Sequence, residues 1–149
     1  MLAAISGRAD EPLLKIFFSN PHLSHLLLEA TVLFFKIAGK FITPDLSGSI
    51  LSGITRMSVI DVLRDKGFEV IERPITISEI IEASKNGTLE EAFGTGTAVG
   101  IAMVGEIGNK DLCIKFPEEN PVSVMVNETL NAIKVQDIED KFGWIVEAK

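Results

Sequence analysis

From Leu33 to the end of the chain, short apolar segments alternate with stretches of helical periodicity, and several of these stretches carry their own start and stop signals. The clearest is a helix predicted over 77–86, because Thr76 and Glu79 form a capping box before it and Gly87 follows its last turn. A chain in which strands and helices alternate must bury one against the other. The pattern therefore predicts a mixed α/β fold of the α+β type.

The same signals place the next elements. Aromatic and β-branched residues on both sides of Ala38 and Gly39 predict a hairpin over 33–43 that ends at Pro44. Helical spacing predicts a helix that begins near Gly53, and it leads into a strand over 68–75. Lys66 and Gly67 are expected to end that helix, and an acidic turn is expected over 89–92. A strand over 99–104 should turn through 105–108 and pair with 111–116. A last helix is expected over 122–138, with Val122, Val126, Leu130 and Ile133 on one stripe, followed by an extended segment over 142–147.

Residues 1 to about 30 lack this organisation. Pro12, Asn20 and Pro21 interrupt any continuous helix there, so at most one short helix over 22–31 is expected. The sequence thus predicts a divergent leader over 1–30 and one folded domain over 31–149, which is long enough to bury a core of its own.

Charge and composition exclude several classes of protein. The net charge of −7 and the absence of a Lys/Arg stripe speak against a nucleic-acid partner. The apolar stretch 23–35 is shorter than the about 20 residues of a spanning helix and contains His25 and Glu29, so no membrane span is expected. His22 and His25 have no partner at metal-ligand spacing, and Cys113 is the only cysteine, so neither a metal site nor a disulfide is predicted. No signal sequence is recognisable, which favours an intracellular location, cytoplasmic or mitochondrial.

Gly53, Ile54 and Thr55 stand where a loop becomes a helix. Unpaired N–H groups and the positive end of the helix dipole would point at a common spot there, and the threonine hydroxyl could donate to an anion. A plain helix cap explains the same residues, so both interpretations stay open. Arg56 could add a charged donor, but an arginine in a first helical turn is more often a solvated side chain.

A second segment, Gly94-Thr95-Gly96-Thr97-Ala98, has the composition of an anion-binding loop. Two glycines free the backbone and two hydroxyls can donate to an anion, although a flexible turn would also explain the glycines. The two segments together favour a phosphate site more than either does alone.

At these residues the sequence is similar to a known family. The string TPDLSGSILSGITRMSVIDVLRDKGFEVIERPITISEIIEASKNGTLEEAFGTGTA, continuing through VGEI, resembles branched-chain amino-acid aminotransferases of the class IV pyridoxal-phosphate family, and DIEDKFGWIVE resembles the closing segment of that family. The resemblance starts near Leu33. It implies an incomplete C-terminal large domain of the D-amino-acid/branched-chain aminotransferase-like fold.

The resemblance also implies a function. Such enzymes are usually homodimers that move the amino group of leucine, isoleucine or valine onto 2-oxoglutarate, with pyridoxal phosphate as cofactor. By position, Gly53, Ile54 and Thr55 would hold the cofactor phosphate, together with Gly96 and Thr97. Thr97 and Ala98 would face the substrate carboxylate.

This sequence departs from the family pattern where covalent catalysis takes place. Members form a Schiff base through a lysine in a segment followed by Gly-Asn-Tyr, and the chain contains no such segment. Where members carry Glu-x-Gly-Thr-Met-Asn, this chain has LLEATV, with Leu27 in place of the glutamate and Glu29 in place of the glycine. Lys15 lacks the pocket that would lower its pKa. No catalytic residue is therefore predicted.

Three hypotheses remain. In the first, the chain is a truncated aminotransferase homologue that is inactive alone. In the second, it is a non-catalytic protein that binds pyridoxal phosphate or phosphate, or that assembles with a full-length relative. In the third, a separately encoded N-terminal half restores the enzyme. Exposed apolar surface would favour assembly, and co-purification would distinguish the third hypothesis from the first.

Overall fold

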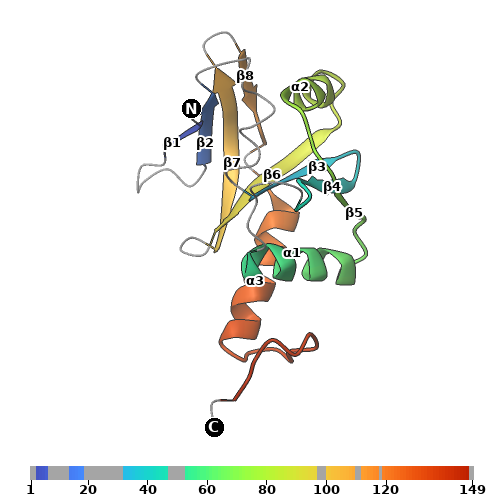
Figure 1. Ribbon diagram of the computed structural model, residues 1–149, viewed down its shortest axis with the longest axis vertical. Helices are drawn as coiled ribbons and strands as arrows, with labels where there is room; N and C mark the ends of the chain where they lie inside the picture. Colours follow the sequence, from blue (N-terminus) through green and yellow to red (C-terminus); the bar gives the residue numbers. More distant parts are fainter. Residues whose placement is uncertain are drawn as a thin grey trace.

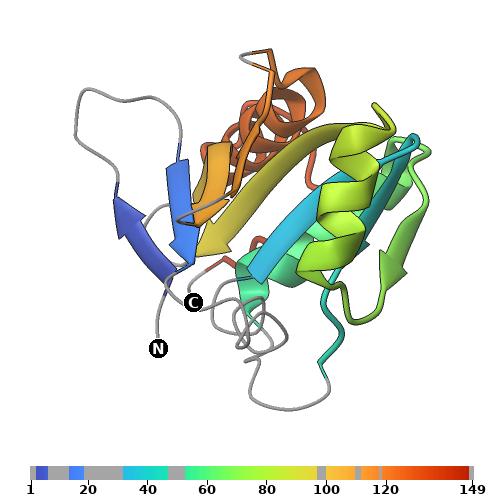
Figure 2. The same ribbon diagram turned by 90° about the horizontal axis from the view of Figure 1, so that it is seen from above.

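The computed structural model describes residues 3–6, 14–18, 32–46, 53–96, 100–109, 112–117 and 119–147. Its elements in chain order are β1 (Ala3–Ser6), β2 (Leu14–Phe18), β3 (Val32–Ile37), β4 (Lys40–Thr43), α1 (Ile54–Asp65), β5 (Val70–Glu72), α2 (Ile77–Lys85), β6 (Leu89–Gly96), β7 (Gly100–Asn109), β8 (Leu112–Lys115) and α3 (Pro121–Lys134). Strands and helices pack into one mixed structure, shown in Figures 1 and 2, which confirms the predicted fold class.

All the described strands belong to one sheet of eight strands. The order is β1-β2-β7-β6-β3-β4-β5, and β8 pairs with β7 outside that path. The pairs β2–β7 and β4–β5 are parallel and the others are antiparallel. The long strand β7 pairs with β6 through its first residues and with β2 and β8 through its later ones, so it joins the two ends of the sheet.

Helices cover both faces of the sheet. Because side chains alternate along a strand, Phe34 of β3 points to the face that α1 and α3 cover, while Leu33 and Phe35 point to the face that α2 covers. On the first face, the fully buried rings of Phe34 and Phe93 stack with their centroids 5.0 Å apart. The apolar side chains of α1 and α3 pack against this pair, so the positions of both helices depend on β3 and β6.

Several sequence predictions are confirmed. β3 and β4 form the expected hairpin, and α1 ends at Lys66 with Gly67 at a φ of 87°. Thr76 caps α2, because its hydroxyl oxygen accepts the backbone N–H of Glu79. β8 pairs with β7 as expected. The last helix is also present, although it ends at Lys134 rather than 138.

Two predictions near glycine and acidic residues are wrong. The segment 89–92, expected as an acidic turn, is the first half of β6, and β7 continues through Gly105 and Gly108 instead of turning. Both strands have partners on two sides, and these ladders override the local preference of glycine for turns. No strand is assigned within 142–147, which the sequence predicts as an extended segment, and the carboxylate of Asp140 accepts the N–H groups of Phe142 and Ile145.

The first residues of the chain also contain strands that the sequence did not predict. β1 pairs with β2, and β2 lies parallel to β7 with Ile16 beside Ile107. They were missed because each is very short, and a parallel strand pair depends on a partner far along the chain. The helix expected over 22–31 lies outside the described residues, and the division of the chain at residue 30 stays a prediction.

Candidate functional site

The start of α1 is built to receive a negative charge. Gly53 is the N-cap residue with φ −72° and ψ 137°, no side chain caps the helix, and its first turn holds no acidic residue. The first backbone bond within the helix runs from the N–H of Met57 to the carbonyl of Gly53, at 3.1 Å. The N–H groups before Met57 therefore lack acceptors within the helix, and the helix dipole adds a partial positive charge at the same point.

The glycine at position 53 is not required by the backbone. Its φ is negative, as any residue adopts, and a Cβ added there would meet no atom within 4 Å. The same open space surrounds Gly96 at the end of β6. A small residue in open space is what a site needs if a ligand is to approach the backbone closely. The open space at the two glycines is compatible with a bound anion, and the same open space surrounds turn glycines such as Gly39.

The structure corrects the second predicted loop. Gly94 and Thr95 lie within β6, where Gly94 pairs with Leu33 on one side and Ala102 on the other. Gly96 is the last residue of the strand and is exposed. Figures 1 and 2 show the end of β6 and the start of α1 at the same end of the sheet. Thr97 and Ala98 lie outside the described residues.

The side chains of the predicted site residues differ in exposure. Ile54 is 84% exposed, so an apolar residue lies in solvent at the first helical position. Thr55 is half-buried and turns toward α3, where it lines a pocket together with Ser58. The backbone N–H groups of both residues, which the anion site would use, belong to the open first turn.

Arg56 is not the solvated side chain that the sequence suggested. Only 2% of it is exposed, and its Nη2 donates to the carbonyl of Pro44 at 2.8 Å and to the carboxylate of Glu72 at 2.9 Å. Arg64 donates to the other oxygen of Glu72 at 3.2 Å. Arg56 therefore fastens the first turn of α1 to the end of β4 and to β5, which keeps the helix start in place, and its side chain is not free to bind a ligand.

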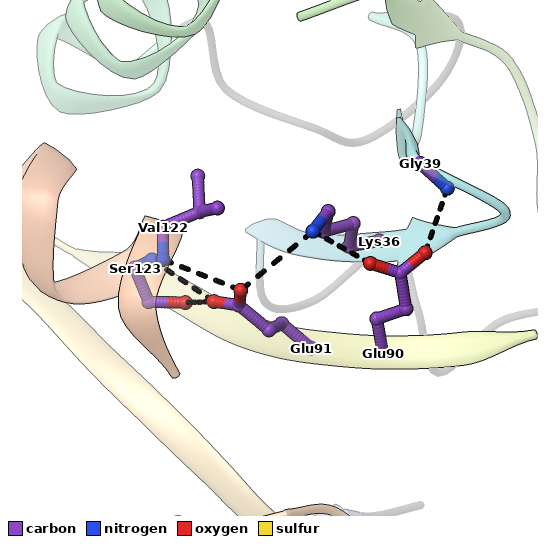
Figure 3. A network of polar contacts seen from close by, with 6 residues as sticks. All are labelled: Lys36, Gly39, Glu90, Glu91, Val122 and Ser123. Atoms are coloured by element: carbon purple, nitrogen blue, oxygen red, sulfur yellow. Dashed lines mark hydrogen bonds and ion pairs between the residues drawn. The ribbon is translucent and has the colours of Figure 1, made fainter. Parts of the chain in front are cut away.

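A network that the sequence did not predict fixes α3 to the sheet. Glu91 of β6 is 2% exposed, and its carboxylate accepts the N–H of Val122 at 3.2 Å, the N–H of Ser123 at 3.0 Å and the hydroxyl of Ser123 at 2.8 Å (Figure 3). Asn120, the N-cap residue of α3, makes no side-chain cap of its own. The carboxylate of Glu91 takes over that capping role from the neighbouring strand.

Lys36 extends the network along β3. Its ammonium lies 2.6 Å from Glu90 and 4.0 Å from Glu91, and Glu90 also accepts the N–H of Gly39 at 2.8 Å. The hydrogen bond from Lys36 holds the pKa of Glu90 below its ordinary value, against the opposing effect of burial. In the pairing of β3 with β6, Lys36 lies opposite Glu91 and Val32 lies opposite Thr95. The two pairs are four residues apart, a distance of about 13 Å along the strand. Lys36 is thus a structural cation at the far end of β3 from Gly96.

Within the described parts of the chain, no three His, Cys, Asp or Glu side chains gather as a metal ion would need. Among the same residues, none of the helices has the length and apolar character to cross a membrane.

Comparison with known proteins identifies the family to which the chain belongs. A family model described as "Amino-transferase class IV" matches residues 28–107, which is more than half of the 149 residues. The chain belongs to the class IV aminotransferases. It is 48% identical to branched-chain-amino-acid aminotransferase 2 of Bacillus subtilis over 117 residues. These residues make up 77% of this chain and 32% of that protein. A mitochondrial branched-chain amino acid aminotransferase 1 of Humulus lupulus is 39% identical over 149 residues, 98% of this chain and 36% of the relative.

Solved structures agree with this family. A branched-chain amino acid aminotransferase of Escherichia coli superposes with a TM-score of 0.64 at 27% identity, over 78% of this chain and 36% of that one. An aminotransferase of Brucella abortus, solved with the cofactor PLP bound, superposes with a TM-score of 0.51 at 25% identity, over 71% and 32%. The chain spans about a third of the length of the class IV relatives that it matches.

We predict that Glu91→Gln lowers the free energy of unfolding by about 1–3 kcal/mol, because the amide puts N–H groups against the donors of α3 and removes the buried charge that they bind. Urea unfolding measures the change. Glu128→Gln, an exposed change on the same helix, is the matched control. Equal effects of the two substitutions would contradict the capping role.

A second prediction concerns pH. Because the pKa of Glu90 is lowered in the folded chain, its contribution to stability is present above the unfolded value of about 4.3 and is lost as the pH falls through the folded pKa. Glu90→Gln should therefore flatten the loss of stability on acidification, measured by urea unfolding between about pH 6 and pH 3. Lys36→Met removes the largest cause of the lowered pKa and should remove most of this pH dependence, while the N–H of Gly39 still donates to Glu90. If Glu90→Gln retains the full wild-type pH dependence, the pair does not act in this way.

Proposed function

We propose that this chain carries the cofactor-phosphate site of a branched-chain aminotransferase, in which Gly53, Ile54 and Thr55 hold the phosphate of pyridoxal phosphate. The observation that carries the proposal is the uncapped start of α1, with a glycine whose absent side chain leaves open space. A phosphate at this place would accept the N–H groups of the first turn and the hydroxyl of Thr55. The residues therefore fit the phosphate of this cofactor.

The end of β6 would complete the site. We infer that Gly96 and Thr97 also donate to the phosphate, and that Thr97 and Ala98 face the substrate carboxylate. Support comes from the position of Gly96, which is exposed at the same end of the sheet as the start of α1. Arg56 would hold the first turn in register with β5 while the phosphate is bound.

The relatives suggest the reaction. They are named branched-chain aminotransferases, so we propose transfer of the amino group of leucine, isoleucine or valine to 2-oxoglutarate as the activity of the complete enzyme. Pyridoxal phosphate, when bound, supplies the electron sink for that reaction. In this reaction, the role of this chain would be to bind the phosphate, to orient the cofactor and to present backbone donors to the substrate. We propose an intracellular location, cytoplasmic or mitochondrial, and one named relative is mitochondrial.

We propose further that the 149-residue polypeptide binds the cofactor without catalysing transamination by itself. None of its lysines lies in a segment followed by Gly-Asn-Tyr, and Lys36 is engaged with two carboxylates far from Gly96. Lys36, a lysine whose side chain the structure describes, is therefore not placed to bond covalently to the cofactor.

A second candidate function is assembly with a full-length aminotransferase or with a second copy of this chain. The observation that favours it is a group of exposed apolar side chains at the start of α1 and on the C-terminal segment. Ile54 is 84% exposed, Met57 51% and Val146 86%. Apolar side chains that gather on a surface often mark a contact with another protein. Co-purification of the tagged chain with a full-length relative would test this function.

We predict that Thr55→Ala weakens binding of pyridoxal phosphate by about 1–3 kcal/mol, because a charged oxygen loses its donor. Thr97→Ala should have an effect of the same size. Isothermal titration calorimetry measures both, and inorganic phosphate serves as the second ligand. Thr129→Ala is the matched control, since the Thr129 hydroxyl bonds to Met125 within α3. Unchanged affinity in Thr55→Ala and Thr97→Ala would refute the phosphate site.

Reduction with borohydride tests the absence of a catalytic lysine. Pyridoxal phosphate is added to the purified chain, an absorbance spectrum is recorded, the mixture is reduced, and peptides are mapped by mass spectrometry. We expect binding without one preferentially modified lysine. A single lysine modified in stoichiometric amount, with a visible absorption band before reduction, would show that a replacement lysine exists and would contradict this proposal.

A further inference from the structure

The first turn of α1, residues 54–57, has a single buried side chain. Ile54 and Met57 are exposed and Thr55 is half-buried, whereas Arg56 is 2% exposed. No side chain caps the turn. A helix start without a cap frays unless another contact holds it, because its first N–H groups have no acceptors within the helix. The position of this turn therefore depends largely on what the side chain of Arg56 binds.

Arg56 binds at the point where two neighbouring strands end. β4 and β5 are parallel with Thr43 opposite Glu72, so both strands end at the same edge. Nη2 of Arg56 donates to the carbonyl of Pro44, which follows β4, and to the carboxylate of Glu72, the last residue of β5. Within the residues that the structure describes, Glu72 is the one carboxylate paired with this buried guanidinium. A buried cation without a counter-charge is strongly unfavourable, so Glu72 keeps Arg56 in place.

The carboxylate of Glu72 is itself held from two sides. Its second oxygen accepts a hydrogen bond of 3.2 Å from Arg64, which lies in the last turn of α1. Each oxygen thus serves an arginine of the same helix, one from the first turn and one from the last. Neither contact uses the free N–H groups of the first turn, so the carboxylate is fixed before any ligand binds.

The charge of Glu72 and its contact with Arg56 have opposite effects on a bound anion. A carboxylate near a phosphate repels it, so its removal would strengthen binding if charge were the only effect. The contact with Arg56 works the other way. It holds in place a residue whose own backbone N–H is one of the unpaired donors of the first turn. Because the two effects differ in sign, an affinity measurement separates them.

We infer that Glu72 is a positioning residue, which holds the first turn of α1 in the geometry that binds phosphate by acting through Arg56. The inference rests on the proposed function, because Glu72 would serve the site at Gly53, Ile54 and Thr55. In this role Glu72 does not touch the phosphate. It supplies order in advance, so that the N–H groups do not have to be ordered when the anion binds.

Calorimetric titration with pyridoxal phosphate tests the inference in the full chain and in two variants. Glu72→Gln removes a negative charge, yet we expect it to weaken binding by about tenfold, because Arg56 loses its counter-charge and the turn loosens. Glu72→Asp keeps the charge on a side chain that is one methylene shorter, and should weaken binding by a smaller factor. Equal or tighter binding in Glu72→Gln would overturn the inference.

Glu69→Gln is the matched control. Glu69 precedes β5 and its carboxylate pairs with Lys40 at 2.9 Å, so the same substitution removes an exposed carboxylate from the same segment without affecting Arg56. This variant should bind the cofactor as the unmodified chain does. Circular dichroism and urea unfolding show whether each variant is folded, and a purely structural role would lower stability without changing the affinity of the folded protein. If Glu72→Gln does not fold, Glu72→Asp decides, and an unchanged affinity in that variant overturns the inference.

Hydrogen exchange tests the position of the turn without a ligand. The N–H of Met57 makes the first backbone bond of α1, to the carbonyl of Gly53, and the N–H of Ile80 makes the corresponding bond of α2. In Glu72→Asp we expect exchange to become faster by about tenfold at Met57 and to stay unchanged at Ile80. Unchanged exchange at Met57 would overturn the inference.

The inference and the proposed function can fail separately. If the unmodified chain binds neither pyridoxal phosphate nor inorganic phosphate, the proposed function fails, and exchange at Met57 alone decides whether Glu72 positions the turn. If the unmodified chain binds the cofactor and both Glu72 variants bind it equally well, the phosphate site stands and the role of Glu72 is overturned.

Discussion

The carboxylate of Glu91 is the interaction on which the arrangement around the site depends. A carboxylate that is 98% buried loses several kcal/mol of hydration, so it persists only where donors replace the water. Here two N–H groups and a hydroxyl at the start of α3 do so, and the ammonium of Lys36 lies 4.0 Å away. The unfilled donors of a helix start and the unfilled acceptors of a buried carboxylate therefore satisfy each other.

This contact determines where the two helices of one face can lie. It holds α3 against β6, and α1 packs against both α3 and the stacked pair Phe34 and Phe93. Arg56 fastens α1 from the other side, through Pro44 and Glu72. The open start of α1 is thus fixed by contacts that do not involve its own N–H groups. Those groups stay available for an anion, and the order that binding requires is largely present beforehand.

Local signals in the sequence were enough to predict the helices and the first hairpin. The capping box of Thr76 and the glycines after α1 and α2 act within a few residues, and the structure has them as expected. The prediction of a turn at Gly105 and Gly108 was wrong, because strand pairing is decided by partners elsewhere in the chain. Propensity is a weak guide for a strand with a partner on each side.

The same limit applies to the candidate site. Gly53, Ile54 and Thr55 could be proposed from the sequence because a helix start is a local feature. The burial of Arg56 could not, since its partners lie 12 and 16 residues away. The role of Glu91 depends on a helix that starts about thirty residues later, at a separation of 31 residues for Val122. A pair of glutamates after a helix gives no local sign of which one will be buried.

The proposal that this chain binds the cofactor without turnover depends on how the chemistry is divided between backbone and side chains. The proposed phosphate site consists mostly of backbone N–H groups at a helix start and at a strand end, so any sequence that keeps the fold and the two glycines keeps most of the site. Covalent catalysis instead needs one lysine at one position, with a pKa set by its pocket. A fold can preserve the first property through packing alone. The second property is lost when a single segment changes.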